Sequence, residues 1–302
     1  MLSETFFIVD FPALLIVILA SILCALMGSF LVLRKEAVMV DALSHSVLPG
    51  IVMGVYLSGS FSILYVMGGA TLSCLIAVLG VYALQRYARI EQGAAIGTVF
   101  TTMFALGVVF LETYIGGRVH LDTQHVLYGA LELTYWANPF EWDSMPMQIK
   151  TLSVMLVITL AFMIVFFKEL RVSTFDPLYA ELQGQYVTAL HLIQILLTAL
   201  IAVSCFEATG SILVISLFVC PAASARMLCD RMETQMWLSA IIGIFCAITG
   251  YFCAGFLPLA LGFEHSINAA AMIAVICGIF LVLSMLFSPA YGVITQKKKL
   301  FN

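Results

Sequence analysis

Charged side chains are scarce in this chain, and their scarcity decides its broad class. Of the 302 residues, 10% are Asp, Glu, Lys or Arg, whereas 63% are hydrophobic. This number of polar groups is too small to cover the surface of a water-soluble globular protein of this size. The sequence therefore predicts an integral membrane protein.

Several catalytic motifs are also missing. No GxxxxGK[ST] phosphate loop occurs, so the chain does not hydrolyse ATP by that route. HExxH and GxSxG are absent, which argues against an intramembrane hydrolase. No CxxC pair occurs, and the eight cysteines lie within or at the end of apolar runs, which favours structural burial over redox chemistry or thiolate ligation. We expect no enzyme here; if the chain pumps a solute, the energy arrives from another polypeptide or from an ion gradient.

Long apolar runs are what the chain has instead, and about 20 apolar residues cross a membrane as a helix. The runs are 11–33, 38–57, 62–84, 94–114, 148–167, 187–206, 208–228, 236–258 and 267–287. The start of the chain is acidic (Glu4, Asp10), not basic as in a signal peptide, so we expect the first run to stay in the mature chain. The sequence predicts an all-α, polytopic protein with one transmembrane domain over residues 1–302. Nine spans are expected; eight full spans plus one broken or re-entrant helix is the alternative.

Basic residues indicate the orientation. With nine spans, every Lys and Arg except Arg118 and Lys150 falls on one side. The positive-inside rule then places the N-terminus outside and the C-terminus in the cytoplasm. The outer side collects most of the acids, which either concentrate cations through their field or are ordinary solvated loop residues.

Two connections are longer than a simple turn. Residues 115–146 form the outer one, and an interfacial helix is expected in its middle. The inner one contains RVSTFDPLYAELQGQ, in which Asp176 and Pro177 begin a helix of about two turns and Gly184 ends it. A short cytoplasmic helix at 172–184 is a segment that a partner protein can grip.

The second run contains the stretch VDALSHSVLPG, which places an acid and an imidazole among apolar residues. Asp41 and His45 are spaced i, i+4, so on a helix they share one face. Ionisable groups at membrane depth are expensive and usually face a bundle interior or an aqueous path. Pro49 has no N–H to give to the carbonyl of residue 45, which favours a bend there, and Gly50 permits close helix approach. His191, in the sixth run, has no spacing that indicates a role.

Three interpretations of Asp41 and His45 remain open from spacing alone: a metal site, a proton relay in a secondary transporter, and a structural hydrogen bond. Carboxylate and imidazole without thiolate suit Mn²⁺, Fe²⁺ or Zn²⁺ better than Cu⁺. Two ligands are too few for a closed site, so a metal site predicts a second copy of the helix across a twofold axis.

Three stretches of the chain resemble one known family in register. DALSHSVLPG, FDPLYAELQG and ATGSILVISLFVCPAASARML are similar to signatures of the ABC-3 family, the permease subunits of bacterial manganese, zinc and iron ABC importers. The resemblance covers nearly the whole chain. It implies a permease of the type II importer class in the bacterial inner membrane, working as a homodimer or as a heterodimer with a related permease. It also implies two cytoplasmic ATPase subunits and an extracytoplasmic metal-binding protein. We expect no nucleic-acid partner and no permanently bound cofactor.

The resemblance also implies roles for particular residues. Asp41 and His45 fall on the positions that hold the transported divalent metal. The segment that docks in the ATPase is matched by Phe175, Asp176, Pro177, Ala180 and Gly184, although Leu178 stands where the family usually has a polar residue. Pro221 matches the proline of a later span, and with Pro49 and Gly50 it is a candidate kink or gating position. Family members with the Leu-Pro-Gly continuation favour Mn²⁺, with Fe²⁺ next. The alternative function is a gradient-driven cation transporter that uses Asp41 and His45 as an exchange site.

Overall fold

The computed structural model describes residues 6–59, 63–115, 131, 134–136, 144–260, 262, 267–288 and 292, and every regular element in this part of the chain is a helix. Nine of these helical stretches are long and apolar enough to cross a membrane, which confirms the predicted all-α, polytopic fold. The spans are Ile8–Leu33, Val38–Ser58, Tyr65–Tyr87, Gln92–Tyr114, Met147–Phe175, Val187–Thr209, Ser211–Leu228, Met232–Pro258 and Ala269–Phe287.

The chain divides into two compact units. The first unit is Met1–Lys35, Gln124–Phe167 and Cys205–Asn302, and the second unit is Glu36–Thr123 and Lys168–Ser204. Helix α8 (Met147–Phe175) begins in the first unit and ends in the second. It departs from helical geometry at Phe166 (φ −104°, ψ 15°), directly before the chain passes from one unit to the other. The assignment of residues 1–302 to a single permease domain stays a prediction.

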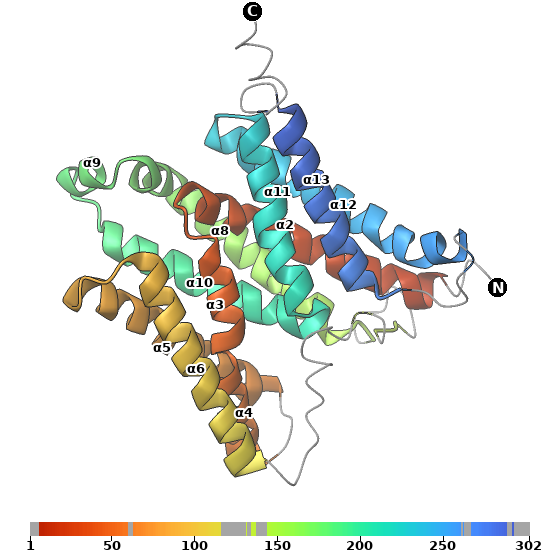
Figure 1. Ribbon diagram of the computed structural model, residues 1–302, viewed down its shortest axis with the longest axis horizontal. Helices are drawn as coiled ribbons and strands as arrows, with labels where there is room; N and C mark the ends of the chain where they lie inside the picture. The colour runs from red at the N-terminus through yellow and green to blue at the C-terminus, as the bar shows by residue number, and fades with distance from the viewer. Residues whose placement is uncertain are drawn as a thin grey trace, which may run out of the picture. The chain divides into compact units, whose positions relative to one another are not determined.

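The first unit is built around α2 (Phe11–Leu33), which follows a π-helical turn at Phe6–Asp10. It packs against α11 (Ser211–Leu228) and α12 (Met232–Ala260), and α13 (Ala269–Phe287) packs against the same two helices (Figure 1). A Cβ atom at Gly28 would collide with the carbonyl oxygen of Phe218, so α2 and α11 approach at van der Waals distance. Small residues permit such close backbone contacts between apolar helices in lipid.

The second unit contains α3 (Val38–Ser46), α4 (Leu48–Ser58), α5 (Ile63–Tyr87) and α6 (Gln92–Phe110), which continues into a π-helical turn at Leu111–Ile115. It also contains α9 (Pro177–Leu182) and the first part of α10 (Val187–Thr209). Its buried core includes Leu43, Cys74, Ile96 and Ala199 from four of these helices. This core supports α3, the helix that carries Asp41 and His45.

Most of the long connection at 115–146 lies outside the described residues, and so does the interfacial helix expected there. The described part includes Trp136, which is buried in the first unit. Its backbone N–H donates to the carbonyl of Ile8 (2.9 Å), its Nε1 donates to Ser144 Oγ (3.0 Å), and its ring stacks on Phe11. Trp136 therefore anchors the end of this connection to the start of the chain.

Candidate functional site

Helix α3 places both candidate ligands on one face, as the spacing predicts. It begins where the backbone N–H of Met39 donates to the carbonyl of Glu36 (2.9 Å). Asp41 lies in its first turn and His45 in its last turn. An acid near a helix N-terminus interacts favourably with the helix dipole. The local sequence thus suits a short helix that displays this pair.

The two side chains lie close together without being joined by a hydrogen bond. His45 Nε2 and Asp41 Oδ1 are 3.7 Å apart, which is longer than a hydrogen bond. An ion about 2.1 Å from each donor atom can bridge atoms up to about 4.2 Å apart. The side chains are 36% exposed for His45 and 51% exposed for Asp41 within the single chain. The pair is therefore open to an ion or to a second chain.

Two aromatic rings of α6 hold the imidazole. The ring centroid of His45 lies 5.1 Å from that of Phe100 and 5.6 Å from that of Phe104, the second contact being edge to face. These contacts restrict the rotation of the imidazole and cover it with apolar surface. Phe100 and Phe104 therefore form the wall of the candidate site, a feature that the second apolar run does not reveal.

The neighbouring hydroxyls do not add ligands. Ser44 Oγ donates to the backbone carbonyl of Asp41 (2.7 Å), and Ser46 Oγ donates to that of Ala42 (2.7 Å). Among the described residues, no group of three or more His, Cys, Asp or Glu side chains is placed to hold a metal. One described chain therefore offers two protein ligands at this level.

The helix changes character just after His45. Val47 keeps helical dihedral angles, but it separates α3 from α4 because Pro49, in the first turn of α4, has no N–H to donate. Gly50 lies against Gly69 of α5 so closely that a Cβ on either residue would collide with the carbonyl oxygen of the other. Pro221 lies buried inside α11, which belongs to the first unit. The gating role of these positions stays a prediction.

The FDP segment leads into the short helix α9: Phe175 is the last residue of α8, and α9 begins at Pro177. Asp176 caps it, because its Oδ1 accepts a hydrogen bond from the backbone N–H of Tyr179 (3.0 Å), and Pro177 occupies the first turn. Gly184 ends it with φ of 79°. The backbone N–H of Gln185 donates to the carbonyl of Ala180 (3.0 Å), and that of Gly184 donates to Glu181 (2.9 Å), which is a Schellman motif.

Large apolar side chains stand exposed on and beside α9. Leu178 is 74% exposed, and the remaining members of the group are Phe175, Tyr179, Leu182 and Tyr186. Ala180, in contrast, is fully buried, so it belongs to the packed face of the helix. An apolar surface on a short polar connection is typical of a protein contact. We call these five exposed residues the α9 surface.

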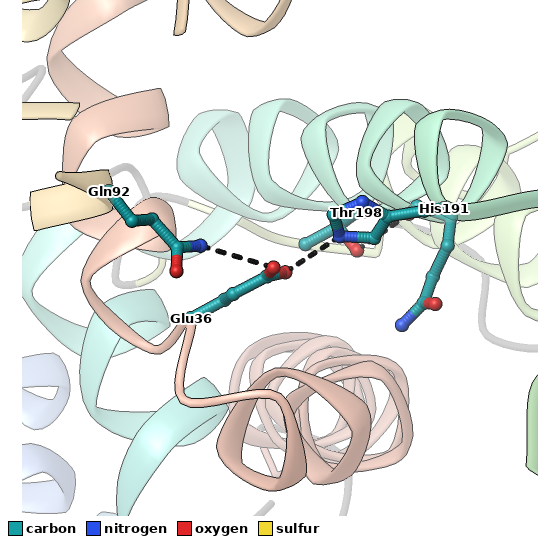
Figure 2. Close-up of polar contacts among 5 residues, drawn as sticks. Glu36, Gln92, His191 and Thr198 are labelled. Atoms are coloured by element: carbon teal, nitrogen blue, oxygen red, sulfur yellow. Dashed lines mark hydrogen bonds and ion pairs between the residues drawn. The ribbon is translucent and has the colours of Figure 1, made fainter. Parts of the chain in front are cut away.

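Sequence reasoning missed a polar cluster in the second unit. Glu36, in the connection before α3, accepts a hydrogen bond from Gln92 Nε2 at its Oε1 (3.1 Å). Its Oε2 lies 3.0 Å from His191 Nε2. Figure 2 shows both partners on either side of the carboxylate. The partners are 56 and 155 residues away in the chain, so no local pattern reveals them. The one sign of this cluster in the sequence is a histidine, His191, within an apolar run.

The chain is similar to known proteins over most of its length. The ABC 3 transport family matches residues 7–288. The manganese transport system membrane protein MntD of Bacillus subtilis (strain 168) is 36% identical over 287 residues, which are 94% of this chain and 94% of the relative. The zinc transport system membrane protein TroD of Treponema pallidum (strain Nichols) is 36% identical over 284 residues, which are 93% of this chain and 75% of the relative. The solved structure of PsaBC from Streptococcus pneumoniae has a TM-score of 0.76 at 23% identity, covering 96% of this chain and 94% of that chain, and it supports the fold alone.

Proposed function

The chain belongs to the ABC 3 transport family as a membrane permease subunit of an ABC metal importer, and we propose that it moves Mn²⁺ into the cytoplasm through a site that contains Asp41 and His45. A permease subunit is not itself catalytic, and ATP is hydrolysed by a separate subunit. The observation that carries the proposal is the half-exposed pair of donor atoms, 3.7 Å apart on one face of α3.

Donor chemistry limits the metal to a class, and the preference for Mn²⁺ within that class rests on the Leu-Pro-Gly continuation after His45. One carboxylate and one imidazole suit Mn²⁺, Fe²⁺ and Zn²⁺, and the order of intrinsic affinities favours Zn²⁺ over Mn²⁺ at a flexible site. The relatives carry both names, since the Bacillus subtilis protein is named for manganese and the Treponema pallidum protein for zinc. We favour Mn²⁺, with Fe²⁺ and Zn²⁺ next, and assign metal selectivity to the extracytoplasmic binding protein and to gating.

A second permease chain completes the site in this proposal. Two ligands from one chain leave a transition ion with open positions. A second Asp41 and His45, or the matching residues of a related permease, would supply two more across a twofold axis. The exposure of both side chains in the single chain supports such a contact.

The ATPase contacts the permease at α9 in this proposal. The α9 surface supplies apolar anchors for the contact, and its capped ends make α9 a rigid lever. ATP binding and hydrolysis in the partner would displace α9. This displacement would open the site that contains Asp41 and His45 alternately to each side of the membrane. The bend at Pro49 and Gly50, and Pro221 in α11, are the positions we assign to gating. We place the chain in the bacterial cell membrane with its N-terminus outside, and the distribution of Lys and Arg supports this orientation.

Transport by the assembled complex tests this function. The permease, its ATPase and its binding protein are reconstituted in proteoliposomes, and uptake of radioactive Mn²⁺ is followed. We expect uptake that requires ATP, stops with a hydrolysis-deficient ATPase and is insensitive to a protonophore. Uptake that persists without ATP and collapses with the protonophore would instead support gradient-driven exchange, an alternative that the family membership does not favour.

A further inference from the structure

Glu36 is a buried acid at the point where α3 begins. Its side chain is 9% exposed, and its backbone carbonyl accepts the first hydrogen bond of α3, from Met39. The preceding residue, Lys35, has φ of 61°, a left-handed conformation that is unfavourable for a side chain with a Cβ. Burying a carboxylate is unfavourable unless its oxygens are paired. The backbone and the side chain of Glu36 are therefore both held in place by specific contacts.

The two partners of Glu36 come from two different helices. Gln92 is the first residue of α6, and His191 lies in the second turn of α10 (Figure 2). Each side-chain oxygen of Glu36 has one partner, with distances of 3.1 Å to Gln92 and 3.0 Å to His191. Three elements of the second unit are thus joined at one carboxylate.

Each of these elements leads to a part of the proposed transport machinery. α3 carries Asp41 and His45. α6 carries Phe100 and Phe104, which hold the His45 ring. α10 follows α9 after a tight turn closed by the hydrogen bonds of Gly184 and Gln185. His191 is therefore connected to α9 by helical backbone and a fixed turn.

The steric fit of apolar side chains sets the preferred positions of one helix against another, and a hydrogen bond adds a directional constraint to that fit. Hydrogen bonds to a charged group are directional and roughly twice as strong as neutral ones. In the second unit, α3, α5, α6 and α10 share an apolar core. A hydrogen bond from Ser73 Oγ to the carbonyl of Ser46 adds a polar contact between α5 and α3. Among the described contacts, Glu36 provides a polar link from α10 to the start of α3, and a second one to α6.

We propose that Glu36 is a positioning residue that transmits the displacement of α9 through His191 to α3, and through Gln92 to the α6 wall of the site. The inference rests on the proposed function, in which α9 contacts the ATPase and Asp41 and His45 bind the metal. Breaking the link uncouples ATP hydrolysis from transport and leaves the metal-binding groups in place.

The test measures Mn²⁺ uptake and phosphate release together in proteoliposomes that contain the full complex. The variants are E36A, H191A, their double variant and H191Q, which keeps a side-chain donor. Coupling free energies usually correspond to roughly 5–150-fold effects, so we expect uptake per ATP to fall about fivefold or more in E36A and H191A. The Mn²⁺ concentration for half-maximal uptake stays within about twofold, which is less than 0.5 kcal/mol.

Two further results separate transmission from simple support of the fold. The double variant should be no worse than either single variant, because both remove the same link, and H191Q should restore most of the coupling. E91Q is the matched control, since it removes a neighbouring acid whose side chain is exposed, and it should leave uptake per ATP unchanged.

The inference is overturned if uptake per ATP hydrolysed in E36A and H191A equals that of the unmodified complex. This holds whether both rates are normal or both fall in proportion. If E36A does not assemble, H191A still decides, because the His191 side chain is 28% exposed and its truncation is expected to leave the fold intact. Failure of the unmodified complex to take up Mn²⁺ with ATP refutes the proposed function, whereas a transporting complex whose variants stay coupled refutes the role of Glu36 alone.

Discussion

Gly50 of α4 and Gly69 of α5 lie backbone against backbone, and a Cβ on either residue would collide with the carbonyl oxygen of the other. Ser73 Oγ of α5 donates to the carbonyl of Ser46 at the end of α3 (2.6 Å), which adds a polar contact on the same side. These contacts hold the α3–α4 junction against α5 directly after His45. The position of the candidate metal ligands thus depends on two glycines that carry no chemistry of their own.

Replacement of Gly69 by alanine should destabilise the protein, whereas replacement of Gly68 should not. A Cβ at Gly68 meets nothing within 4 Å, while one at Gly69 meets the backbone of Gly50. Both substitutions improve helix propensity by up to about 1 kcal/mol, so the difference between them isolates the packing contact. Overpacking of this kind costs about 1–3 kcal/mol. Thermal unfolding of the purified proteins in detergent measures the difference, and equal midpoints would contradict the close approach.

Replacement of either candidate ligand should abolish uptake without disturbing assembly. Loss of a partner outside the ligand shell already lowers metal affinity roughly 10–100-fold, so we expect Asp41→Ala and His45→Ala to reduce Mn²⁺ uptake at limiting metal by at least about 100-fold. Ser44→Ala is the matched control, because Ser44 lies on the same helix and its hydroxyl contacts the helix backbone. Size-exclusion chromatography checks assembly. Near-normal uptake in both ligand variants would remove the site assignment.

A charge on the α9 surface should prevent the ATPase from binding. Leu178→Glu places a carboxylate in the proposed apolar contact, and burying it costs more than about 1.4 kcal/mol, or at least tenfold in affinity. Leu57→Glu is the control, since Leu57 is 69% exposed, similar to Leu178 at 74%, but lies in the last turn of α4. Co-purification of the tagged permease with its ATPase provides the measurement. Equal recovery of the ATPase with both variants would exclude Leu178 from the contact.

Loss of the Asp176 cap should weaken coupling and leave metal binding unchanged. Asp176→Ala removes the oxygen that accepts from Tyr179, at about 1 kcal/mol of local helix stability. Asp176→Asn keeps an acceptor oxygen and should retain most of the activity. Uptake per ATP hydrolysed should therefore fall in the alanine variant only, with the same half-maximal Mn²⁺ concentration in both. A fully coupled alanine variant would count against a docking role for this turn.

Local patterns predicted the features that depend on nearby residues. The nine apolar runs appear as nine candidate spans, and the predicted starts and ends agree with the described helices to within four residues, except that the fifth run ends at 167 whereas its helix continues to Phe175. The Asp176-Pro177 and Gly184 signals enclose α9, because capping and a left-handed glycine are properties of adjacent residues. Pro49 interrupts the helix after His45 because a missing N–H acts one turn away.

Contacts between distant residues were not predictable in the same way. Gly50 was recognised as a point of close approach, but its partner Gly69 was not, since many glycines in apolar runs carry the same signal. Phe100 and Phe104 are ordinary apolar residues in sequence, and only the packing of α6 on α3 places them against His45. The spacing of His191 in the sequence indicates no role, and its contact with Glu36 forms only in the folded chain.

The sequence by itself determined that this protein crosses the membrane, which segments do so, the family it belongs to, and that Asp41 and His45 share a helix face. Composition, apolar run length and helical spacing suffice for the membrane class, the spans and the shared face, whereas the family was identified by the resemblance of three signature stretches. Only the tertiary structure decided which ring surfaces hold the imidazole, which glycines meet, and that Glu36 joins α3 to α6 and α10. Those pairings depend on which helix faces pack together, and that choice is made by the summed fit of many side chains rather than by any local motif.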